Sequence, residues 1–485
     1  MPSSLPAVSW SALLPMLVIT GTGLLVLVLD SFTPPAQRSR LAGISLLGIL
    51  AAAGAVGAAW GQPEIVFSGM LAADAFGQFF SLLLLLVVGL TVLISIPYVR
   101  RTGMDHGEYY ALLLFGTLGM MIMANSLDLI TIFLGLETLS ISLYILAGFL
   151  REQLKSNESA LKYLLLGAFA SGFVLYGIAL VYGATGSINL RRVAEVVAAG
   201  KTASPTLLII GMGLLIIGFG FKVASVPFHM WTPDVYEGAP TSVTAFMIAG
   251  TKAAAFAAFL RILMTALPVL QADWSRVLWV LAVLTMTVGN VVAVAQSNIK
   301  RMLAYSSIAH AGYILVAMVA GSKLGSGSVL FYLVAYAFMN LGAFAVVIAL
   351  PHHDGERVSI DEYAGLGLRY PFLGAAMALF MFSLAGIPPT GGFMGKFYIF
   401  SAAIQAKYIG LAVIGVLNSV ISVYYYLRVT VVMYMGQGEA EPATGRLSPA
   451  LVLAVLIAML GTLQLGLFPS RFLEVALRSV GALLG

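Results

Sequence analysis

Five ionisable side chains stand out because they lie inside stretches that are otherwise apolar enough to cross a membrane. Four are lysines and one is a glutamate: Lys162, Lys222, Lys252, Lys396 and Glu137. An ionisable group at membrane depth costs about 2.5–3.5 kcal/mol on insertion scales, so such groups are rarely kept without a task. Burial disfavours the charged form of a lysine and a nearby carboxylate favours it, so a movable pair can bind and release a proton. The series predicts proton movement.

The simpler alternative is that these side chains only join helices. One glutamate cannot neutralise four lysines, however, and the unpaired lysines would be costly as inert groups. Lys162 stands just inside its span and could also extend toward the membrane surface. We expect Glu137, Lys222, Lys252 and Lys396 to form a proton path in which Glu137 controls the charge of Lys222. Lys162 is expected as a second partner near Glu137.

His229 and His310 are further candidates, because an unperturbed imidazole titrates near neutral pH. His310, in YSSIAHAGYIL, could bridge the two halves of the path. Each histidine could instead satisfy a backbone carbonyl at a helix break or end. Asp234 and Glu237, in WTPDVYEGAP, are expected in a short loop segment as caps or interface groups, although a proton exit could use them.

The composition places the whole chain in a bilayer. Of 485 residues, 60% are hydrophobic and 9% are charged, with a mean hydropathy of +1.00. The net charge of +5 is spread thinly, without a long basic run that would attract nucleic acid. The absence of cysteine excludes disulfides, thiolate-bound iron–sulfur clusters and c-type haem attachment. Any electrons would therefore be carried by another chain.

Membrane spans of about 20 apolar residues recur about fourteen times along the chain. They lie near residues 11–30, 41–60, 74–97, 109–126, 128–150, 161–183, 205–229, 241–267, 277–297, 302–321, 327–350, 372–401, 408–434 and 449–468. The piece from Arg471 to Leu484 is too short to span and predicts an amphipathic helix at the interface. The predicted fold is an all-α integral membrane protein with a single polytopic domain, residues 1–485.

Arginine and lysine gather on the cytoplasmic side of membrane proteins, so their distribution among the loops predicts orientation. Loops after odd-numbered spans hold Arg38, Arg40, Arg100, Arg101, Arg151, Lys155, Lys300, Arg301, Arg357, Arg369, Arg428 and Arg446. Loops after even-numbered spans hold only Arg191, Arg192, Lys201, Arg261, Arg276, Lys323 and Lys407. Both termini are therefore expected on the outer side.

Two spans carry both a lysine and a helix breaker. In the seventh span Pro227 follows Lys222, and in the twelfth span Pro388 and Pro389 precede Lys396. Proline removes a backbone donor and clashes with the preceding turn, so both helices should be discontinuous. Discontinuous helices that carry an ionisable group form the ion sites of many transporters.

The two broken helices are five spans apart, which predicts two five-helix repeats. An odd number of spans in each repeat makes the repeats inverted. The predicted regions are three N-terminal helices in 1–108, a first repeat in 109–267, a second repeat in 277–434, and a last helix with its tail in 435–485.

Three passages resemble the antiporter-like subunits of respiratory complex I and their relatives in multisubunit cation/proton antiporters. They are FKVASVPFHMWTPDVYEGAP, QSNIKRMLAYSSIAHAGY and SLAGIPPTGGFMGKFYIF, and the resemblance runs from about residue 70 to 435. Within that family, Lys396 argues against the subunit type that typically has glutamate there. The short tail argues against the type that carries a long lateral helix.

The resemblance implies fourteen transmembrane helices, two inverted repeats and a central hydrophilic axis. It also implies that Glu137, Lys222, Lys252 and Lys396 match the proton-channel residues of the family, with Lys162 a further match. Such a chain would be a non-redox subunit of a proton-pumping NADH:quinone oxidoreductase in a bacterial inner membrane. It would hold no cofactor; NADH, FMN, iron–sulfur clusters and quinone would belong to partner subunits. Energy would reach it through the other membrane subunits from the peripheral redox arm.

Two other functions stay open from the residues alone. A cation/proton antiporter subunit would show sodium or potassium dependence and no association with redox proteins. A non-transporting scaffold would keep proton pumping intact when Lys222 or Lys396 is removed. An organic-solute carrier fits less well, because the polar groups form a series rather than one compact recognition site.

Overall fold

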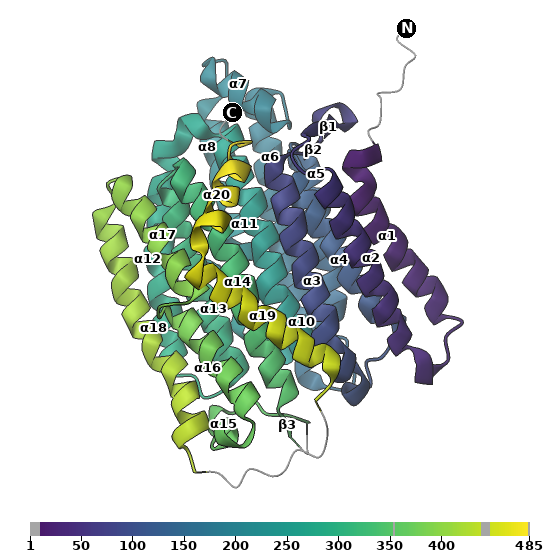
Figure 1. Cartoon of the computed structure of the whole chain (residues 1–485). Coiled ribbons are helices and arrows are strands. Elements are labelled where there is room, and N and C mark those ends of the chain that lie inside the picture. Colours follow the sequence, from purple (N-terminus) through teal and green to yellow (C-terminus); the bar gives the residue numbers. More distant parts are fainter. Residues whose placement is uncertain (1–9, 353–354, 438–446, 484–485) are drawn as a thin grey trace.

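The computed structural model describes residues 10–352, 355–437 and 447–483, and within these ranges the chain is a bundle of long, roughly parallel helices (Figure 1). Helices satisfy their own backbone hydrogen bonds, which a bilayer requires of every spanning segment. Thirteen helical passages of the described chain are long and apolar enough to cross a membrane. They are α1 (Trp10–Asp30), α2 (Ser39–Ala58), α3 (Ala75–Thr102), α4 (Gly107–Asn125), α5 (Leu129–Ala147), α6 (Leu154–Thr185), α8 (Pro205–Val223), the composite helix Thr241–Ala266, α12 (Gln271–Val294), α13 (Ile299–Val319), α14 (Lys323–Ala349), α18 (Ile409–Met435) and α19 (Pro449–Leu467).

A fourteenth passage is the broken helix formed by α16 (Pro371–Ala385) and α17 (Gly391–Gln405). Thirteen of the fourteen passages expected from hydropathy are thus confirmed, and the remaining one corresponds to this broken helix. The composite helix consists of α10 (Thr241–Phe246), a π-helical turn η3 (Met247–Thr251), α11 (Lys252–Arg261) and a second π-helical turn η4 (Ile262–Ala266).

Short elements fill the loops at both ends of the bundle. The helices are α7 (Leu190–Ala198), α9 (Trp231–Gly238), α15 (Leu366–Arg369), and the 3-10 turns η1 (Pro35–Gln37), η2 (Phe67–Gly69), η5 (Pro268–Leu270) and η6 (Ile360–Tyr363). Two small antiparallel hairpins pair β1 (Glu64–Val66) with β2 (Leu71–Ala73) and β3 (Pro351–His352) with β4 (Gly355–Glu356). The hairpins stay local, so the all-α expectation holds for the membrane-crossing part.

The centre of the bundle is formed by the composite helix, α13 and α14. Their most apolar windows are 100%, 94% and 100% buried within the chain, whereas those of α1 and α2 are only 33% buried. Side chains on the three central helices therefore face protein on all sides. Lys252 and His310 lie on two of these helices.

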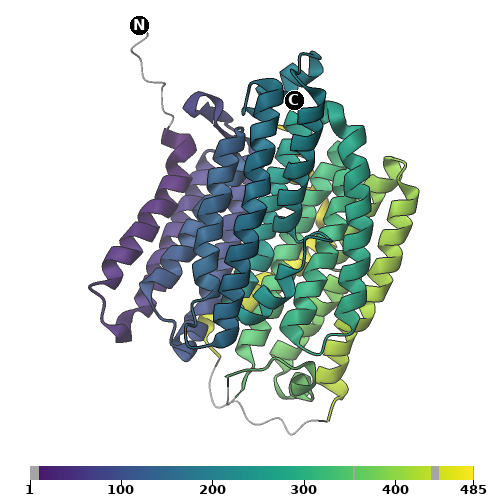
Figure 2. The same ribbon diagram turned by 180° about the vertical axis from the view of Figure 1, so that it is seen from behind.

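The passages alternate in direction, so loops after odd-numbered passages lie together at the lower end in Figure 1. Five passages separate the starts of α4 and α12, and these two helices are therefore antiparallel, as inverted repeats require. Figure 2 shows the same alternation from behind, with α1 at one edge of the bundle and α18 at the other.

The C-terminal segment differs from its expected place at the membrane interface. Helix α20 (Pro469–Val480) packs along α14 and α3 and rises beside them instead of lying across the end of the bundle (Figure 1). It buries the small or apolar side chains of Ala476, Ser479 and Val480. The first residues of α1 and the end of α20 lie at the same end of the bundle. Arg446 and Leu484 lie outside the described residues.

Candidate proton path

The first broken helix places Lys222 at its break. Helix α8 ends at Val223 because Ala224 adopts a left-handed conformation (φ 61°, ψ 42°), and α9 begins only at Trp231. The break predicted from Pro227 is confirmed, although the helix ends four residues earlier. Lys222 lies in the last turn of α8 and is 2% exposed.

Lys222 donates a hydrogen bond from Nζ to Ser140 Oγ on α5 at 2.7 Å. Glu137 lies one helical turn before Ser140, and its carboxylate accepts a hydrogen bond from Ser171 on α6. The rings of Tyr144 and Tyr163 lie 5.9 and 5.7 Å from the Lys222 ammonium. Glu137 and Lys222 thus each bond to a serine instead of to each other. The distance between the carboxylate and the ammonium can therefore change without breaking a direct ion pair.

The second broken helix holds its lysine after the break. Gly386 ends α16 in a left-handed conformation (φ +88°), and Lys396 follows in the second turn of α17. Its ammonium donates to the carbonyls of Leu384 and Ala385, at 3.1 and 2.9 Å, and to Ser419 Oγ at 2.8 Å. The lysine therefore faces the negative, C-terminal end of the half-helix α16.

Lys252 lies on the composite helix directly after the π-helical turn η3. It is 1% exposed and donates to the carbonyl oxygen and, at 2.8 Å, to the hydroxyl of Ser307 on α13. A π-helical turn widens the helix locally and is frequent at functional sites. Within the described chain, the Lys252 ammonium thus bonds to neutral oxygen atoms of the neighbouring helix α13 and to no carboxylate.

One face of α13 links Lys252 to Lys396. Ser307 contacts Lys252, His310 follows three residues later, and the ring of Tyr313, after three more, lies 4.9 Å from the Lys396 ammonium. Residues three apart on a helix share a face, and six residues rise about 9 Å. His310 is 1% exposed, and its Nδ1 and Nε2 contact the hydroxyls of Tyr332 and Tyr426 at 2.5 and 2.9 Å. The structure therefore brings His310 between the two lysines.

Lys162 does not lie where it was expected. Its ammonium bonds to Asp234 at 2.7 Å and to Glu158 at 2.6 Å, and its side chain is 39% exposed. Ser171, which binds Glu137, lies nine residues further along α6, or about 13 Å of helix. The expectation that Lys162 is a partner of Glu137 is wrong, because a carboxylate from α9 takes that place.

Asp234 and Glu237 are members of an ion-pair cluster rather than helix caps. Arg301 on α13 donates to Asp234 at 2.8 Å and to Glu237 at 2.9 Å, and Lys155 donates to Glu237 at 2.9 Å. Burial raises the pKa of both carboxyls, but hydrogen bonds from Lys155, Lys162 and Arg301 outweigh it and hold the values below the ordinary ones. The cluster joins α6, α9 and α13 at the lower end of the bundle.

His229 lies within the break after α8 and is half-buried. Its Nδ1 is buried and has no hydrogen-bond partner among the described residues, and its carbonyl accepts the Thr232 amide at 2.9 Å. No bond in the described chain connects this imidazole to the lysines. His229 therefore contributes to the start of α9 through its backbone carbonyl and not through its ring.

Sequence reasoning missed the neutral groups that surround the charged ones. They are Ser140, Ser171, Ser307, Tyr332 and Tyr426, all on neighbouring helices or neighbouring turns. Ser140 and Ser307 are three residues from Glu137 and His310, so helical spacing could have identified them. The two tyrosines come from other helices and have no local signal.

A buried ion pair at the opposite end of the bundle was also missed. Asp74 caps α3 by accepting the Gly77 amide, as expected for a carboxylate at a span end. It also binds Arg261 through two bonds of 2.8 Å, and Arg261 is completely buried. This pair fixes the end of the composite helix to the start of α3.

A membrane bundle in which each of two broken helices holds a buried lysine, with a buried histidine between the second of these lysines and a third one, defines an antiporter-like transporter subunit. The protein-family model described as NADH:quinone oxidoreductase/Mrp antiporter, TM, matches residues 126–422. The chain belongs to this family, and within it to the N subunits of NADH-quinone oxidoreductase.

The relatives that support this assignment match almost the whole chain. NADH-quinone oxidoreductase subunit N from Trichlorobacter lovleyi is 52% identical over 473 residues, which cover 98% of this chain and 97% of the relative. A chain of respiratory complex I from Thermus thermophilus is 38% identical, with a TM-score of 0.81 and coverage of 95% of this chain and 98% of that one. A chain of the Mrp complex from Dietzia sp. is 21% identical, with a TM-score of 0.83 and coverage of 98% and 100%, and shares the fold.

Proposed function

We propose that this chain translocates protons as the N subunit of a bacterial NADH-quinone oxidoreductase, driven by electron transfer from NADH to quinone in partner subunits. Family membership supports the assignment of the subunit. The observation that carries the transport step is the set of three buried lysines, Lys222, Lys252 and Lys396, whose hydrogen bonds go to hydroxyl and carbonyl oxygens.

A buried ammonium is costly unless a carboxylate compensates its charge. The three lysines are 1–4% exposed, and their bonded partners are neutral. Each lysine can therefore be held charged only while a counter-charge is near, and it releases its proton when that charge moves away. Inert structural lysines would be expected to pair with acidic groups, as Lys155 does with Glu237.

The proposed path begins at Glu137 and Lys222 and continues through Lys252 and His310 to Lys396. From Lys252 onward the path follows the α13 face formed by Ser307, His310 and Tyr313.

The hydroxyls of Tyr144, Tyr163, Thr251 and Tyr336 are buried near these groups and have no protein partner among the described residues. Buried polar groups of this kind are usually satisfied by ordered water, which would complete the proton wire.

Glu137 is the proposed switch. Its carboxylate lies one turn from Ser140, the serine that binds Lys222, so a small shift of α5 or α8 changes their separation. Approach of Glu137 keeps Lys222 charged, and withdrawal releases the proton toward Lys252. Partner subunits would drive this movement.

The chain itself is proposed to hold no redox cofactor. NADH, FMN, iron–sulfur clusters and quinone would reside in partner subunits, which reach this chain through the other membrane subunits. The positive-inside rule supports a bacterial inner-membrane location with both termini outside, so that the lower end in Figure 1 faces the cytoplasm.

Inverted membrane vesicles that contain the assembled complex test the path. With Lys222→Ala or Glu137→Ala, we expect NADH-driven proton uptake to fall by about tenfold or more, the low end of what positioned proton-transfer groups contribute. Proton uptake in the Lys396→Arg variant should fall as far, because arginine keeps the charge and does not release a proton. Electron transfer from NADH to an artificial acceptor should persist in all three.

Lys201→Ala, a change on an exposed loop, is the matched control and should pump normally. Undiminished pumping in the Lys222 and Glu137 variants would refute the path.

Affinity purification of the tagged chain tests the partners: inhibitor-sensitive NADH:quinone reductase activity should co-purify. Sodium-dependent proton flux without redox partners would establish the antiporter alternative.

A further inference from the structure

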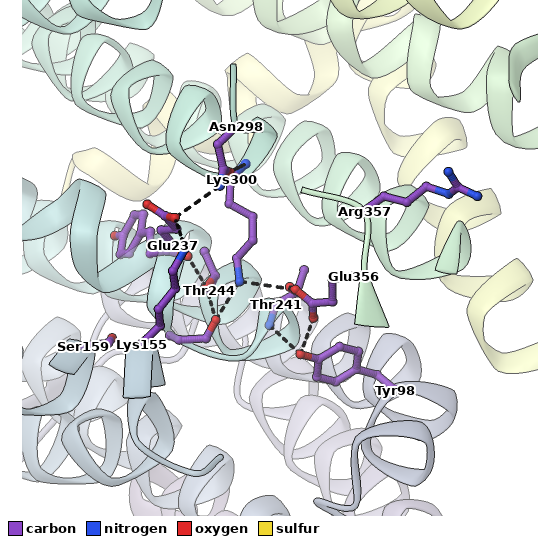
Figure 3. A network of polar contacts seen from close by, with 12 residues as sticks. Tyr98, Lys155, Ser159, Glu237, Thr241, Thr244, Asn298, Lys300, Glu356 and Arg357 are labelled. Atoms are coloured by element: carbon purple, nitrogen blue, oxygen red, sulfur yellow. Dashed lines mark hydrogen bonds and ion pairs between the residues drawn. The ribbon is translucent and has the colours of Figure 1, made fainter. Parts of the chain in front are cut away.

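A cavity of about 560 Å³ opens at the lower end of the bundle, between α3, α6, α9, α13 and the β3–β4 hairpin. Figure 3 shows the polar contacts among several of its lining residues. Its polar lining includes Tyr98, Lys155, Glu237, Lys300 and Glu356. The cavity lies on the side assigned above to the cytoplasm. None of these residues belongs to the lysine path, so the role of the cavity is unaccounted for.

Glu356 is the group through which the cavity connects to the interior of the bundle. One carboxylate oxygen accepts from the Tyr98 hydroxyl at 2.5 Å, the other accepts from the Thr241 hydroxyl at 2.6 Å, and the Lys300 ammonium lies 3.5 Å away. The Thr241 amide also donates to the Tyr98 hydroxyl at 3.0 Å. The Glu356 side chain is 24% exposed, so it contacts the cavity and the buried hydroxyls at once.

Glu356 is ionised at neutral pH, so a proton that it binds from the cavity is held only briefly and can be passed on. Burial alone would raise the pKa of its carboxyl, but the Lys300 charge and the bonds from Thr241 and Tyr98 hold it below the ordinary value of 4.5.

A ladder of buried hydroxyls continues upward from this carboxylate. Ser242, next to Thr241, contacts the Tyr109 hydroxyl at 2.7 Å, and Tyr109 contacts Ser95 at 2.8 Å. Ser95 bonds to the carbonyl of Thr91 at 2.6 Å. All of these side chains are completely buried. The hydroxyls of Ser242, Tyr109 and Ser95 thus form one continuous buried chain.

The ladder ends at the height of Lys252. The Thr91 hydroxyl donates to the Val87 carbonyl at 2.8 Å, and Val87 packs on Gly250, where an added Cβ would lie 3.4 Å from Val87 Cγ1. Gly250 lies in the π-helical turn, two residues before Lys252. Between them, the Thr251 hydroxyl is buried and has no hydrogen-bond partner among the described residues.

We propose that Glu356 takes up protons from the aqueous phase at this end of the bundle and passes them along the hydroxyl ladder to Lys252. At Ser242, Tyr109 and Ser95, each hydroxyl oxygen binds the arriving proton and releases its own proton to the next oxygen. Ordered water beside the buried polar groups would carry the proton from Glu356 to Ser242 and from Ser95 to Lys252, so that only O–H bonds break and form until the neutral Lys252 amine binds the proton. This inference rests on the proposed function and adds a second point of entry, which joins the path at Lys252.

A structural role is the alternative, because Glu356 also anchors its hairpin to Tyr98 and Lys300. Glu356→Gln keeps the shape and the hydrogen-bonding oxygen but cannot carry a proton. Because this change also breaks the ion pair, the double variant Glu356→Gln with Lys300→Gln removes both charges. An ion-pair anchor should recover in the double variant, whereas a proton relay should stay impaired.

The measurement is NADH-driven proton uptake by inverted vesicles that contain equal amounts of assembled complex. We expect Glu356→Gln to lower the uptake rate by about tenfold, Tyr98→Phe to lower it to a smaller extent, and Glu356→Asp to retain more activity than Glu356→Gln. Glu152→Gln is the matched control, because Glu152 lines a neighbouring cavity at the same end and lies off the ladder. It should pump normally.

The outcomes separate this inference from the proposed function. Two results would each overturn the role of Glu356: normal pumping by Glu356→Gln, or full recovery in the double variant. If Lys252→Met has a pumping defect at the same time, the lysine path stays in place. Normal pumping by Lys252→Met as well would overturn the lysine path itself. Lost uptake in Glu356→Gln and the double variant, with normal uptake in the control, would support proton loading at Glu356.

Discussion

Individual side chains in this molecule divide into two chemical classes according to their partners. The lysines of the path bond to neutral oxygens, whereas Lys155, Lys162 and Arg301 pair with carboxylates near the lower end of the bundle. Paired charges gain stability by staying charged, and unpaired buried lysines gain by losing a proton. The bonding partner of a basic side chain, rather than its residue type, therefore distinguishes the lysines proposed to carry protons from the basic residues that hold helices together.

The ion-pair cluster of Asp234, Glu237 and Arg301 predicts acid sensitivity. The pKa values of both carboxyls are lowered in the folded chain from 3.8 and 4.5, so their contribution to stability is complete above those ordinary values. It is lost as the pH falls through the lowered values, below about pH 4.

The midpoint of thermal unfolding of the purified complex in detergent, measured from neutral to acidic pH, checks this sensitivity. Asp234→Asn with Glu237→Gln should lower the midpoint at neutral pH and flatten its fall in acid. A midpoint in this variant that falls as steeply as in the unmodified chain would contradict the prediction. Glu195→Gln, which removes an exposed pair with Arg192 on α7, is the control.

Among the elements, the broken helix α16–α17 predicts a second outcome. Gly386 has a φ of +88°, and an added Cβ would lie 3.0 Å from Lys396 Cδ and 3.2 Å from its Nζ. Gly386→Ala should therefore strain the backbone by about 1 kcal/mol and displace the ammonium from the carbonyls of α16. We expect reduced proton uptake with an intact complex.

Gly410→Ala provides the comparison for this change. Gly410 lies in the first turn of α18 and has no atom within 4 Å of a Cβ added to it, so the substitution should leave uptake unchanged. Equal uptake rates in the Gly386 and Gly410 variants would show that the geometry of the break does not position Lys396.

Hydropathy was sufficient to predict the membrane passages, because each of them must be long, apolar and helical regardless of its neighbours. Proline predicted both breaks for a local steric reason, although α8 ends at Val223 rather than at Pro227. The π-helical turn before Lys252 carries no proline and has no comparable signal in the sequence.

Contacts between distant segments could not be predicted in the same way. Lys162 bonds to Asp234, 72 residues away, and Tyr98 bonds to Glu356, 258 residues away. Such pairings depend on how each helix is rotated and on where loops return, and a hydrophobic pattern along one chain contains neither. The same reason explains why α20 was expected at the interface: its amphipathic pattern fits a protein groove as well as a membrane surface.

For the whole molecule, the charges define a direction across the membrane. The sequence places more basic residues in the loops after odd-numbered passages, which lie at the lower end in Figure 1, and the proton-loading carboxylate Glu356 belongs to the β3–β4 hairpin at that end. If this end faces the cytoplasm, both features follow from one orientation: the loops obey the positive-inside rule, and protons are taken up from the side that the pump depletes.

The chain contains no cysteine, so single introduced cysteines can test that orientation directly. Glu152→Cys lies in the exposed turn before α6 at the lower end, and Lys201→Cys lies in the exposed loop after α7 at the opposite end. In inverted vesicles, a membrane-impermeant maleimide should label this subunit in the Glu152→Cys variant and spare it in the Lys201→Cys variant. Right-side-out vesicles should give the reverse result. Labelling of the Lys201→Cys variant in inverted vesicles would place the cavity of Glu356 on the outer side, where it would serve proton release.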